Sequence, residues 1–403
     1  MKKKILIRGP VLSRSGYGEM ARLALRSLMS QPDKYDIYLQ ATGWGNSSWL
    51  TKRDKERETI DKLITKSVQY FNHASNIDAT LQITIPNEWD SRMCPINIGY
   101  TAGIETDNVS PEWVAKANSM NGVIVISDHS KQAFSNTKIT MENSLTGEKK
   151  EGVGLEVPIK TVGMLPKFVE PEEISGVKFD YPFNFLCVAQ WNPRKNIEKT
   201  IEWWIEEFID QKVGLVLKTS IAGNCIIDKE KVEQRLESVL SSYPDRKCKV
   251  YLLHGDLEDG HMNWLYQHDN IKCLINLSHG EGLGLPMLEA ANNALPVMTI
   301  DWSGQTDFLI NGGKKYFSDV KYELNEIQPD AVWPGVLEEG TKWAFADQGS
   351  FKMKLRDMKK NWKKHKKNAT TLKGIVNKNY TEEKIHHSFC NAVSNILEKS
   401  FKL

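Results

Sequence analysis

Residues 279–297, HGEGLGLPMLEAANNALPV, decide the fold, because a glycine-rich loop here separates a strand-like apolar segment from a helix-like segment. The preceding residues 271–278, IKCLINLS, form an apolar run that is typical of a buried parallel strand. The following residues 287–293 have the pattern of a helix, and Pro286 falls near its first turn, where proline is favoured. The stretch therefore predicts a strand, a glycine loop and a helix in succession.

The predicted loop combines glycines with two carboxylates. Gly282, Leu283 and Gly284 would present backbone N–H groups at the positive end of the helix, which suits an anion such as a phosphate. Glu281 and Glu289 stand eight positions apart and would repel a phosphate, so we expect them to accept hydrogen bonds from sugar hydroxyls. Tight backbone packing is the alternative role of the glycines, but it leaves both glutamates unexplained.

This stretch resembles the Glu-x7-Glu signature of retaining GT-B glycosyltransferases, of the family 4 (glycosyl transferases group 1) type that uses nucleotide sugars. The resemblance implies that Glu289 binds the donor ribose and that Glu281 contacts the donor sugar as a catalytic residue. It assigns Gly282, Leu283 and Gly284 to donor binding. It also implies an α/β GT-B fold, in which two doubly wound Rossmann-like domains face each other across a cleft.

A second candidate motif is QWNPRKN, residues 190–196, which follows an apolar strand pattern. It resembles the family's Gly-Arg-x4-Lys turn, whose cations hold the donor diphosphate. Lys195 falls on the lysine position and is a catalytic and donor-binding candidate, while Gln190 replaces the arginine and leaves Arg194 as its substitute. Such cations would stabilise the charge on a leaving diphosphate. A solvated loop is the alternative, and Lys218, which ends the next strand, is a weaker donor-binding candidate.

The N-terminal stretch 9–25, GPVLSRSGYGEMARLAL, also has a strand, loop and helix pattern. Gly16 and Gly18 flank Tyr17 just before the predicted helix, and the segment resembles the family's N-domain glycine loop. The resemblance makes Gly16 and Gly18 donor-binding candidates, although a Gly-x-Gly on its own is a weak signal.

Residues 98–113, IGYTAGIETDNVSPEW, resemble a family segment in which a Glu-Thr pair follows a strand. Glu105 is therefore a catalytic candidate that would orient the acceptor hydroxyl or stabilise positive charge on the sugar. Helix capping by Thr106 or Asp107 is the alternative. For the later Ser127–His129 turn, capping is the preferred interpretation.

Two series of strand and helix patterns, and the length of 403 residues, predict two domains. We expect an N-terminal Rossmann-like acceptor domain at 1–168 and a linker at 169–182. A C-terminal Rossmann-like nucleotide-sugar domain at 183–378 and a final helix at 379–403, packing back toward the first domain, complete the prediction. Residues 141–154 are polar and predict a loop or hairpin insertion.

The composition argues against several classes of protein. No run approaches the 18 consecutive apolar residues of a transmembrane helix. The apolar run near the N-terminus is too short for a signal peptide. The six cysteines form no Cys-x-x-Cys pair. These features predict a cytoplasmic protein with no transmembrane segment. The sequence contains no Asp-x-Asp, so no metal is expected, and no cofactor is expected beyond a nucleotide-sugar donor, for which UDP-sugar is the default.

The charge is concentrated in residues 352–378, which contain eleven Lys/Arg and one acid, a local charge of +10 in a chain of net charge +2. The remainder therefore carries −8. The apolar positions in and just before this segment have helical spacing, so its cations would form one exposed face. Lys359, Lys360, Lys363 and Lys364 are candidates for binding an acceptor or polyanion, such as DNA phosphates or an acidic membrane surface. A solvated helix is the alternative.

The acceptor is not determined by the fold. Phage-encoded glycosyltransferases that modify hydroxymethylated DNA bases share the expected fold, and the Lys/Asn/Ile-rich composition is compatible with a phage protein acting in the host cytoplasm. A hydroxymethylated base is therefore the preferred acceptor. Polysaccharide or glycolipid synthesis is the alternative, and a non-catalytic protein that binds sugar nucleotides or nucleic acid is the alternative from another class.

Overall fold

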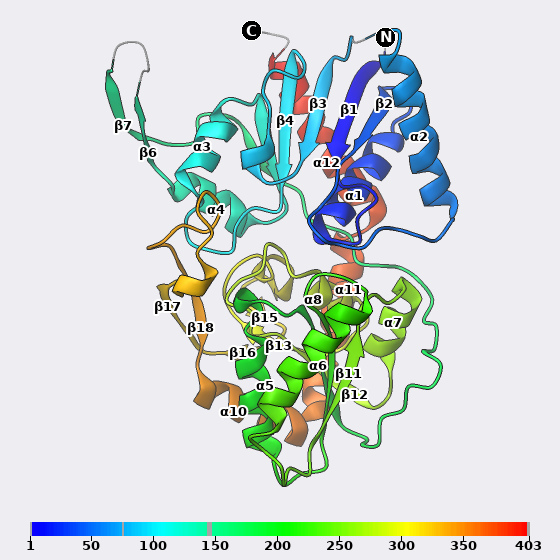
Figure 1. Cartoon of the computed structure of the whole chain (residues 1–403), viewed down its shortest axis with the longest axis vertical. Helices are drawn as coiled ribbons and strands as arrows, with labels where there is room; N and C mark the ends of the chain where they lie inside the picture. The colour runs from blue at the N-terminus through cyan, green and yellow to red at the C-terminus, as the bar shows by residue number, and fades with distance from the viewer. Residues whose placement is uncertain (1, 75, 143–146, 401–403) are drawn as a thin grey trace. The chain divides into compact units, whose positions relative to one another are not determined.

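The computed structural model describes residues 2–74, 76–142 and 147–400, which form two compact units (Figure 1). The chain passes between the two units more than once, because each unit combines segments that lie far apart in the sequence. The first unit comprises Met1–Leu165, Val332–Thr341 and Tyr380–Leu403, and the second comprises Pro166–Ala331 and Lys342–Asn379.

Residues Val332–Thr341 were predicted within the second domain but belong to the first unit. Long-range hydrogen bonds explain this placement. Asn87 Nδ2 donates to Gly335 O at 3.0 Å, and Ser110 Oγ donates to Glu338 Oε1 at 2.6 Å. Because these partners lie more than 200 positions away in the sequence, no local pattern reveals them.

The first unit contains a six-stranded parallel sheet in the order β2-β1-β3-β4-β5-β8. Its strands are predominantly apolar and buried, as expected for a parallel sheet covered on both faces. The order reverses between β1 and β3, which makes this a doubly wound sheet. The bounds are β1 Lys3–Gly9, β2 Tyr35–Ala41, β3 Ala79–Ile83, β4 Ile96–Thr101, β5 Gly122–Val125 and β8 Ile159–Thr161.

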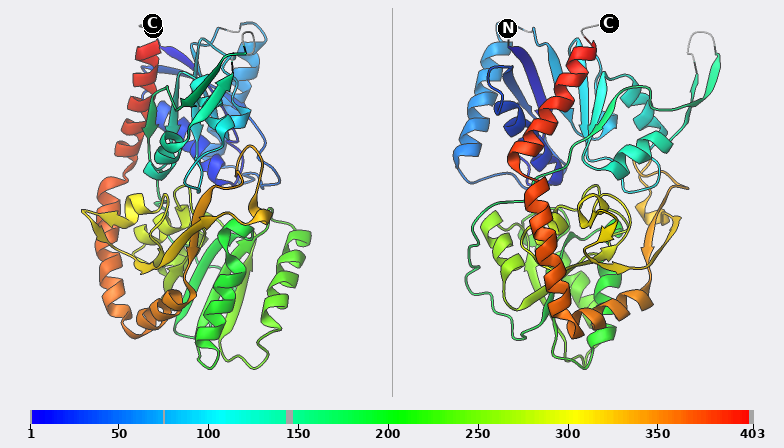
Figure 2. Two further views of the ribbon diagram at one scale, coloured as in Figure 1. Left: turned by 90° about the vertical axis from the view of Figure 1, so that its left-hand side faces the viewer. Right: turned by 180° about the vertical axis from the view of Figure 1, so that it is seen from behind.

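Helices cover this sheet, and α12 packs against α1 and β4 (Figure 2). Ile396 of α12 lies so close to Gly122 that a Cβ there would be 2.8 Å from its side chain. The sequence did not predict α2, because only Ile60 and Ser67 of that helix are buried and no wide apolar stripe marks it. The helices are α1 Gly16–Met29, α2 Lys55–Phe71, α3 Pro111–Asn118, α4 Asp128–Asn136 and α12 Glu382–Ser400, with a 3₁₀ turn at Pro86–Glu88.

The predicted insertion at 141–154 overlaps two strands that pair with each other in an antiparallel hairpin. These strands are β6 Ile139–Glu142 and β7 Lys149–Val153. Residues 143–146, which the prediction also covered, lie outside the described residues.

The second unit contains a six-stranded parallel sheet in the order β11-β10-β9-β12-β13-β16. This is the order of a dinucleotide-binding Rossmann sheet, and it reverses between β9 and β12. The bounds are β9 Asn184–Gln190, β10 Gly214–Ser220, β11 Lys249–His254, β12 Ile271–Ile275, β13 Val297–Ile300 and β16 Ser318–Val320. The sequence pattern predicted strands at 185–189, 215–218, 249–253, 272–276 and 297–300, and each lies within two residues of an observed strand at both ends.

Two antiparallel pairs of strands flank this sheet. The basic segment, residues 352–378, lies in the helices of this unit. That segment is not one helix, because α10 ends at Lys360 and α11 begins at Trp362. The pairs are β14 Ile310–Asn311 with β15 Lys314–Lys315 and β17 Tyr322–Glu326 with β18 Lys342–Ala346. The helices are α5 Ile197–Phe208, α6 Ile226–Leu240, α7 Asp259–Gln267, α8 Leu285–Asn292, α9 Thr306–Leu309, α10 Gln348–Lys360 and α11 Trp362–Asn379, with 3₁₀ turns at Pro193–Lys195 and Pro329–Ala331.

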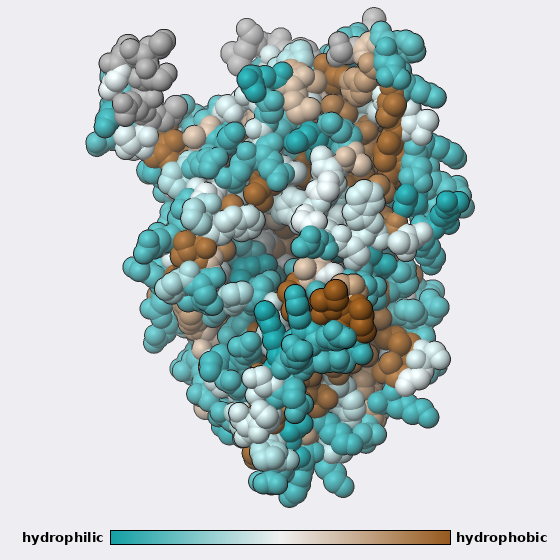
Figure 3. All heavy atoms as spheres, viewed as in Figure 1, coloured by the Kyte–Doolittle hydropathy of each residue, from teal (hydrophilic) through white to brown (hydrophobic). Residues whose placement is uncertain are grey.

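The stretch 169–182, predicted as a linker, has neither helix nor strand and belongs to the second unit. It is held there by Asn263, whose Nδ2 donates to Val169 O at 2.6 Å. Most of the face in Figure 3 is hydrophilic. Within the described part of the chain, no helix combines the length and apolarity needed to span a bilayer.

Candidate functional site

The two main candidate motifs meet at the reversal point of the second sheet. β9 and β12 are hydrogen-bonded neighbours, β9 leads into the 190–196 segment, and β12 leads into the glycine loop. In open α/β sheets, the connections diverge at such a point and leave a crevice at the carboxyl ends of the strands. Motifs that are about 86 positions apart are therefore brought to one edge.

Local hydrogen bonds shape the turn that carries the two cations. Asn192 caps it, with its Oδ1 accepting the N–H of Lys195 at 3.2 Å. Asn196 then adopts a left-handed conformation with φ 51°, which asparagine tolerates better than most residues. Arg194 O accepts the N–H of His279 at 2.9 Å, so the turn is joined directly to the glycine loop.

Both cations converge on the first glutamate of the glycine loop. Lys195 Nζ lies 2.6 Å from each carboxylate oxygen of Glu281, and Arg194 Nη1 lies 3.3 Å from its Oε2. Arg194 Nη1 also donates to Gly280 O at 2.7 Å, and Asn276 Nδ2 donates to Glu281 Oε1 at 3.1 Å. The carboxylate of a side chain that is only 5% exposed is thus surrounded by donors.

The electrostatic balance at Glu281 favours the ionised form. Burial raises its pKa, but Lys195 and Arg194 outweigh that effect and lower the pKa to about 2. The cluster therefore retains a carboxylate and two cations at neutral pH. Because both cations are at least partly buried, they are less screened by water and salt than surface charges are.

The loop backbone is held by the segment after β13. Ser303 Oγ accepts the N–H of Glu281 at 2.8 Å, and Gly304 donates its N–H to Glu281 O at 2.9 Å. Ser303 has a left-handed conformation with φ 74°, which costs a non-glycine residue energy and is offset here by its hydrogen bonds. Glu281 is therefore fixed through both its side chain and its main chain.

The glycine loop presents backbone donors at the start of α8. Gly284 is the N-cap residue with φ 87°, and no side chain caps the helix. Across the described residues, none accepts a hydrogen bond from the backbone N–H of Gly282, Leu283 or Gly284. Because these amides follow Glu281 directly, a bound anion could contact both the amides and the neighbouring cations.

Glu289 lies in the second turn of α8 and contacts a buried tyrosine. Tyr266 of α7 donates from its hydroxyl to Glu289 Oε2 at 2.8 Å. Burial raises the pKa of Tyr266 well above its usual value, and the neighbouring Glu289 carboxylate adds to the effect. Tyr266 therefore stays protonated and acts as a permanent donor that orients the carboxylate.

This contact predicts the effect of two substitutions. The resemblance implies that Glu289 binds the donor ribose, so on that expectation Tyr266→Phe should weaken UDP binding about 3- to 10-fold, because a neutral hydrogen bond contributes about 1 kcal/mol. Glu289→Ala should weaken it more, since the carboxylate itself is lost. Calorimetric titration of UDP measures both effects. Tyr243→Phe, which removes a hydroxyl bonded to Glu206 on the surface, is the matched control and should leave UDP affinity unchanged.

Lys218 lies in β10 at the same edge of the sheet, paired with Val188 of β9 and Leu253 of β11. Gln190, the residue at the expected arginine position, is exposed at the end of β9, while Arg194 lies in the cation cluster. The structure therefore brings Arg194, and not Gln190, beside Lys195.

A buried aspartate that the sequence did not suggest shapes the loop after β10. Asp228 accepts backbone N–H groups from three successive residues, Ile221 to Gly223, at 2.8–3.0 Å, and its Oδ1 lies 2.7 Å from His254 Nε2. Burial raises the pKa of Asp228, but the His254 contact and these amides lower it to about 2. No spacing rule links Asp228 to His254, so sequence reasoning missed the pair.

In the first unit, the glycine turn is joined to the end of β4. Ser15 caps α1 by accepting the N–H of Gly18 at 3.1 Å. The Tyr17 hydroxyl lies 2.8 Å from Thr101 Oγ1, and its ring stacks on Trp44 at 4.1 Å between centroids. Gly16 lies at the first position of α1. The two candidate glycines therefore flank a tyrosine that is fixed against the segment leading to Glu105.

The two glycines differ in how much space surrounds them. A Cβ on Gly18 would lie 2.0 Å from Ser13 O, whereas a Cβ on Gly16 would meet nothing within 4 Å. We expect Gly18→Ala to destabilise the protein by about 2–3 kcal/mol, since backbone must move. Gly16→Ala is the matched control, with a change within about 0.5 kcal/mol. Thermal melts of both variants measure the difference.

Glu105 is half-buried in the loop that follows β4, next to Thr106, whose hydroxyl bonds to Asn108 O at 2.8 Å. The alternative in which Thr106 or Asp107 caps a helix is wrong, because Ser110 caps α3. Ser127 caps α4 by accepting the N–H of Ser130, as predicted. Burial lowers the pKa of the nearby His129, and contacts with the backbone at Thr106 and Glu105 oppose this effect.

The four candidate lysines of the basic segment lie elsewhere in the second unit. Lys359, Lys360, Lys363 and Lys364 are exposed at the junction of α10 and α11, and line a pocket with Phe183 and Lys272. Phe183 directly precedes β9, and Lys272 is the second residue of β12, so both mark the amino ends of these strands. The structure does not bring these lysines to the edge that carries Lys195 and Glu281.

No protein-family model and no curated protein sequence matches the chain. Solved structures do match it. A sucrose-phosphate synthase from Thermosynechococcus elongatus aligns with a TM-score of 0.64 and 12% identity over 99% of this chain and 100% of that chain. Anabaena HepE, solved in complex with UDP and glucose, aligns with a TM-score of 0.59 and 14% identity over 97% and 99%.

The longer S. aureus TarM aligns with a TM-score of 0.48 and 15% identity over 78% of this chain, which spans 55% of the TarM chain. The alignments with the sucrose-phosphate synthase and with HepE cover nearly the whole of each chain and include both sheets. They show that the chain has the GT-B fold of two doubly wound Rossmann-like domains, which confirms the predicted fold class.

Proposed function

We propose that the chain is a retaining glycosyltransferase of the family 4 type that transfers a hexosyl or pentosyl group from a nucleotide sugar, by default a UDP-sugar, to an acceptor hydroxyl. The observation that carries this proposal is the Lys195–Glu281–Arg194 cluster beside the glycine loop of the second sheet. It combines cations for a diphosphate with carboxylates for sugar hydroxyls at one strand edge. The HepE structure, which contains UDP and glucose, supports a UDP-sugar as the first donor to test.

In the proposed site, Lys195 and Arg194 bind the diphosphate together with the amides of Gly282, Leu283 and Gly284. Glu289, oriented by Tyr266, accepts hydrogen bonds from the ribose. Glu281 holds the cations in place and contacts the transferred sugar. Lys218 and the Gly16–Gly18 turn are further donor-binding candidates.

In the proposed reaction, the bond between the anomeric carbon and the diphosphate oxygen breaks as the acceptor oxygen attacks from the same face. The acceptor proton passes to the departing phosphate oxygen. Lys195 and Arg194 stabilise the charge that develops on that oxygen, and Glu105 orients the acceptor hydroxyl. The protein thus contributes positioning and electrostatic stabilisation, and needs neither a covalent nucleophile nor a cofactor.

The acceptor that we propose is a hydroxymethylated base in phage DNA, with the protein acting in the cytoplasm of the host. The support is the +10 charge of residues 352–378, which suits a polyanion. A base inside a duplex would have to be flipped out to reach the site.

A donor-release assay tests the proposal. Purified protein is incubated with UDP- and GDP-sugars, with and without duplex DNA that contains hydroxymethylcytosine, and nucleotide release and DNA mass are followed. DNA-dependent release with a matching mass gain supports the whole proposal. Release without a gain in DNA mass points to a polysaccharide or glycolipid acceptor. UDP binding without release from any donor supports a non-catalytic protein that binds sugar nucleotides.

A further inference from the structure

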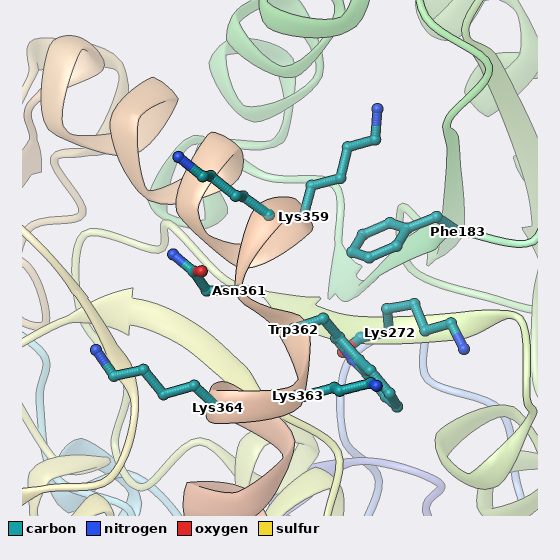
Figure 4. A pocket seen from close by; sticks show the side chains of 8 residues that line it. Phe183, Lys272, Lys359, Asn361, Trp362, Lys363 and Lys364 are labelled. Carbon is teal, nitrogen blue, oxygen red and sulfur yellow. The ribbon is translucent and has the colours of Figure 1, made fainter.

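The junction of α10 and α11 forms a pocket of about 510 Å³ with an unusual concentration of cations (Figure 4). Lys272, Lys359, Lys360, Lys363 and Lys364 line it, and we call it the lysine pocket. In Figure 4 the labelled side chains come from the junction of α10 and α11, from β12 and from Phe183 before β9. Like charges at this density repel one another, so the pocket favours an anionic occupant.

The lysines stand on a rigid corner. Trp362 Nε1 donates to Lys272 O at 3.0 Å, which joins the start of α11 to β12. Asp357, the acid of this corner, is already bonded to Asn361 Nδ2 at 2.7 Å and to His365 Nε2 at 2.8 Å. Lysines on such a held backbone lose less conformational entropy on binding than lysines on a flexible basic tail do.

The pocket lies away from the edge proposed for sugar transfer. Phe183 and Lys272 lie at the amino ends of β9 and β12, whereas Lys195 and Glu281 follow the carboxyl ends of the same strands. The seven residues of β9 span about 20 Å at roughly 3.3 Å per residue. A ligand in the pocket would therefore reach the reaction edge only if it were long.

The shape and lining of the pocket favour a nucleic acid over a membrane. A phosphodiester backbone can enter a concavity, whereas a bilayer contacts protruding surface and is strengthened by inserted apolar side chains. None of the exposed large hydrophobic residues recorded for the described part of the chain lines the pocket. Trp362 is only partly exposed, and Lys272 Nζ lies 4.5 Å from the centroid of its ring.

We propose that the lysine pocket is an anchoring site for the phosphodiester backbone of DNA, separate from the reaction edge, which raises the affinity for an acceptor duplex that is long enough to reach it. This inference rests on the proposed DNA acceptor. At 3.4 Å per base pair, about 20 Å corresponds to roughly six base pairs between an anchored phosphate and the modified base. Short duplexes would reach the reaction edge without engaging the pocket.

The test compares the unaltered protein with the triple variant Lys360→Gln/Lys363→Gln/Lys364→Gln. For a 30-base-pair duplex, the variant should bind at least about 10-fold more weakly at moderate salt. Its slope of log affinity against log salt should fall in magnitude by about 2–3, since up to three phosphate contacts are lost. With a modified duplex of 30 base pairs, KM should rise while kcat stays constant. An eight-base-pair duplex that is modified at its centre has only about four base pairs on either side, too few to reach the pocket, and should show no change.

A matched control removes the same charge elsewhere. Lys34→Gln/Lys55→Gln/Lys62→Gln changes three exposed lysines of the first unit and should behave as the unaltered protein does. The inference is wrong if both variants lose the same amount of DNA affinity, or if neither variant loses any. The inference is also wrong if the triple variant keeps its DNA affinity but loses binding to phosphatidylglycerol vesicles, since that result assigns the pocket to a membrane.

The two proposals fail separately. If DNA accepts no sugar but the triple variant still loses salt-sensitive DNA binding that the control retains, the anchoring site stands and the proposed acceptor reaction fails. If DNA is glycosylated and the triple variant matches the unaltered protein in affinity, salt slope and KM, the reaction stands and the anchoring site fails.

Discussion

Replacing Glu281 by glutamine should reduce sugar transfer at least about 100-fold, a loss typical of removing one preorganised electrostatic group from an active site. Lys195 and Arg194 would then face each other without the carboxylate that lies 2.6 Å and 3.3 Å from them. Their repulsion would displace both from the proposed diphosphate position. Single-turnover donor cleavage at saturating UDP-sugar measures the loss of turnover directly.

The same substitution should also lower stability, because removing one partner of a buried ion pair costs about 3–5 kcal/mol. The pKa of Glu281 is about 2, below its usual value, so its stabilising effect is complete above about pH 4.5 and is lost as the pH falls toward 2. The stability difference between Glu281→Gln and the unaltered protein should therefore shrink over that acidic range. Urea unfolding at a series of pH values tests this.

A surface substitution provides the control for Glu281. Glu230→Gln removes an exposed carboxylate on α6 and should change neither turnover nor stability by a measurable amount. If Glu281→Gln retains full activity while it shows the expected loss of stability, the cluster stabilises the fold and the proposed donor site is wrong.

Gly304→Ala should abolish UDP binding and destabilise the protein by about 3 kcal/mol or more. A Cβ at this position would lie 2.0 Å from Gly282 O and 2.9 Å from Glu281 O. Both atoms belong to backbone, so no side chain can rotate away, and the glycine loop itself must move. Thermal melts with and without UDP measure the change, and the shift that UDP produces in the unaltered protein should disappear.

Gly374→Ala is the matched control for Gly304→Ala. This glycine lies within α11, and a Cβ there would meet nothing within 4 Å. Alanine should stabilise the helix by about 0.5–1 kcal/mol, with the UDP-induced shift unchanged. Retained UDP binding in Gly304→Ala would show that the glycine loop does not form the proposed donor site.

The sequence was most informative where burial imposes a continuous apolar pattern. The run at 271–278 predicted β12, and the similar run at 297–300 predicted β13 with its observed ends. The helix α2 escaped prediction because its surface is mostly exposed and leaves no stripe. The break at Asn361 also escaped, because it depends on the contact of Trp362 with β12 rather than on a local helix-stopping residue.

The candidate site was predicted as separate motifs, but their contacts were not. Lys195 and Glu281 were both expected to act on the donor, with different tasks, and the structure adds that they form an ion pair across 86 positions. The contacts of Asn276, Ser303 and Tyr266 were not predicted, because a single residue carries no spacing signal that identifies its partner. Only the assembled sheet shows which polar residues support the motif.

The position of α12 has a consequence for how the protein is made. The first unit is complete only when Tyr380–Leu403 joins it, and Phe389 and Val393 of α12 are fully buried there. A ribosome produces these residues only after every residue of the second unit has been made. Although domains usually complete folding in the order of their synthesis, the second unit can here finish first. Until residues 380–403 emerge, residues 1–165 expose the apolar face that α12 later covers, and chaperones can recognise that face during translation.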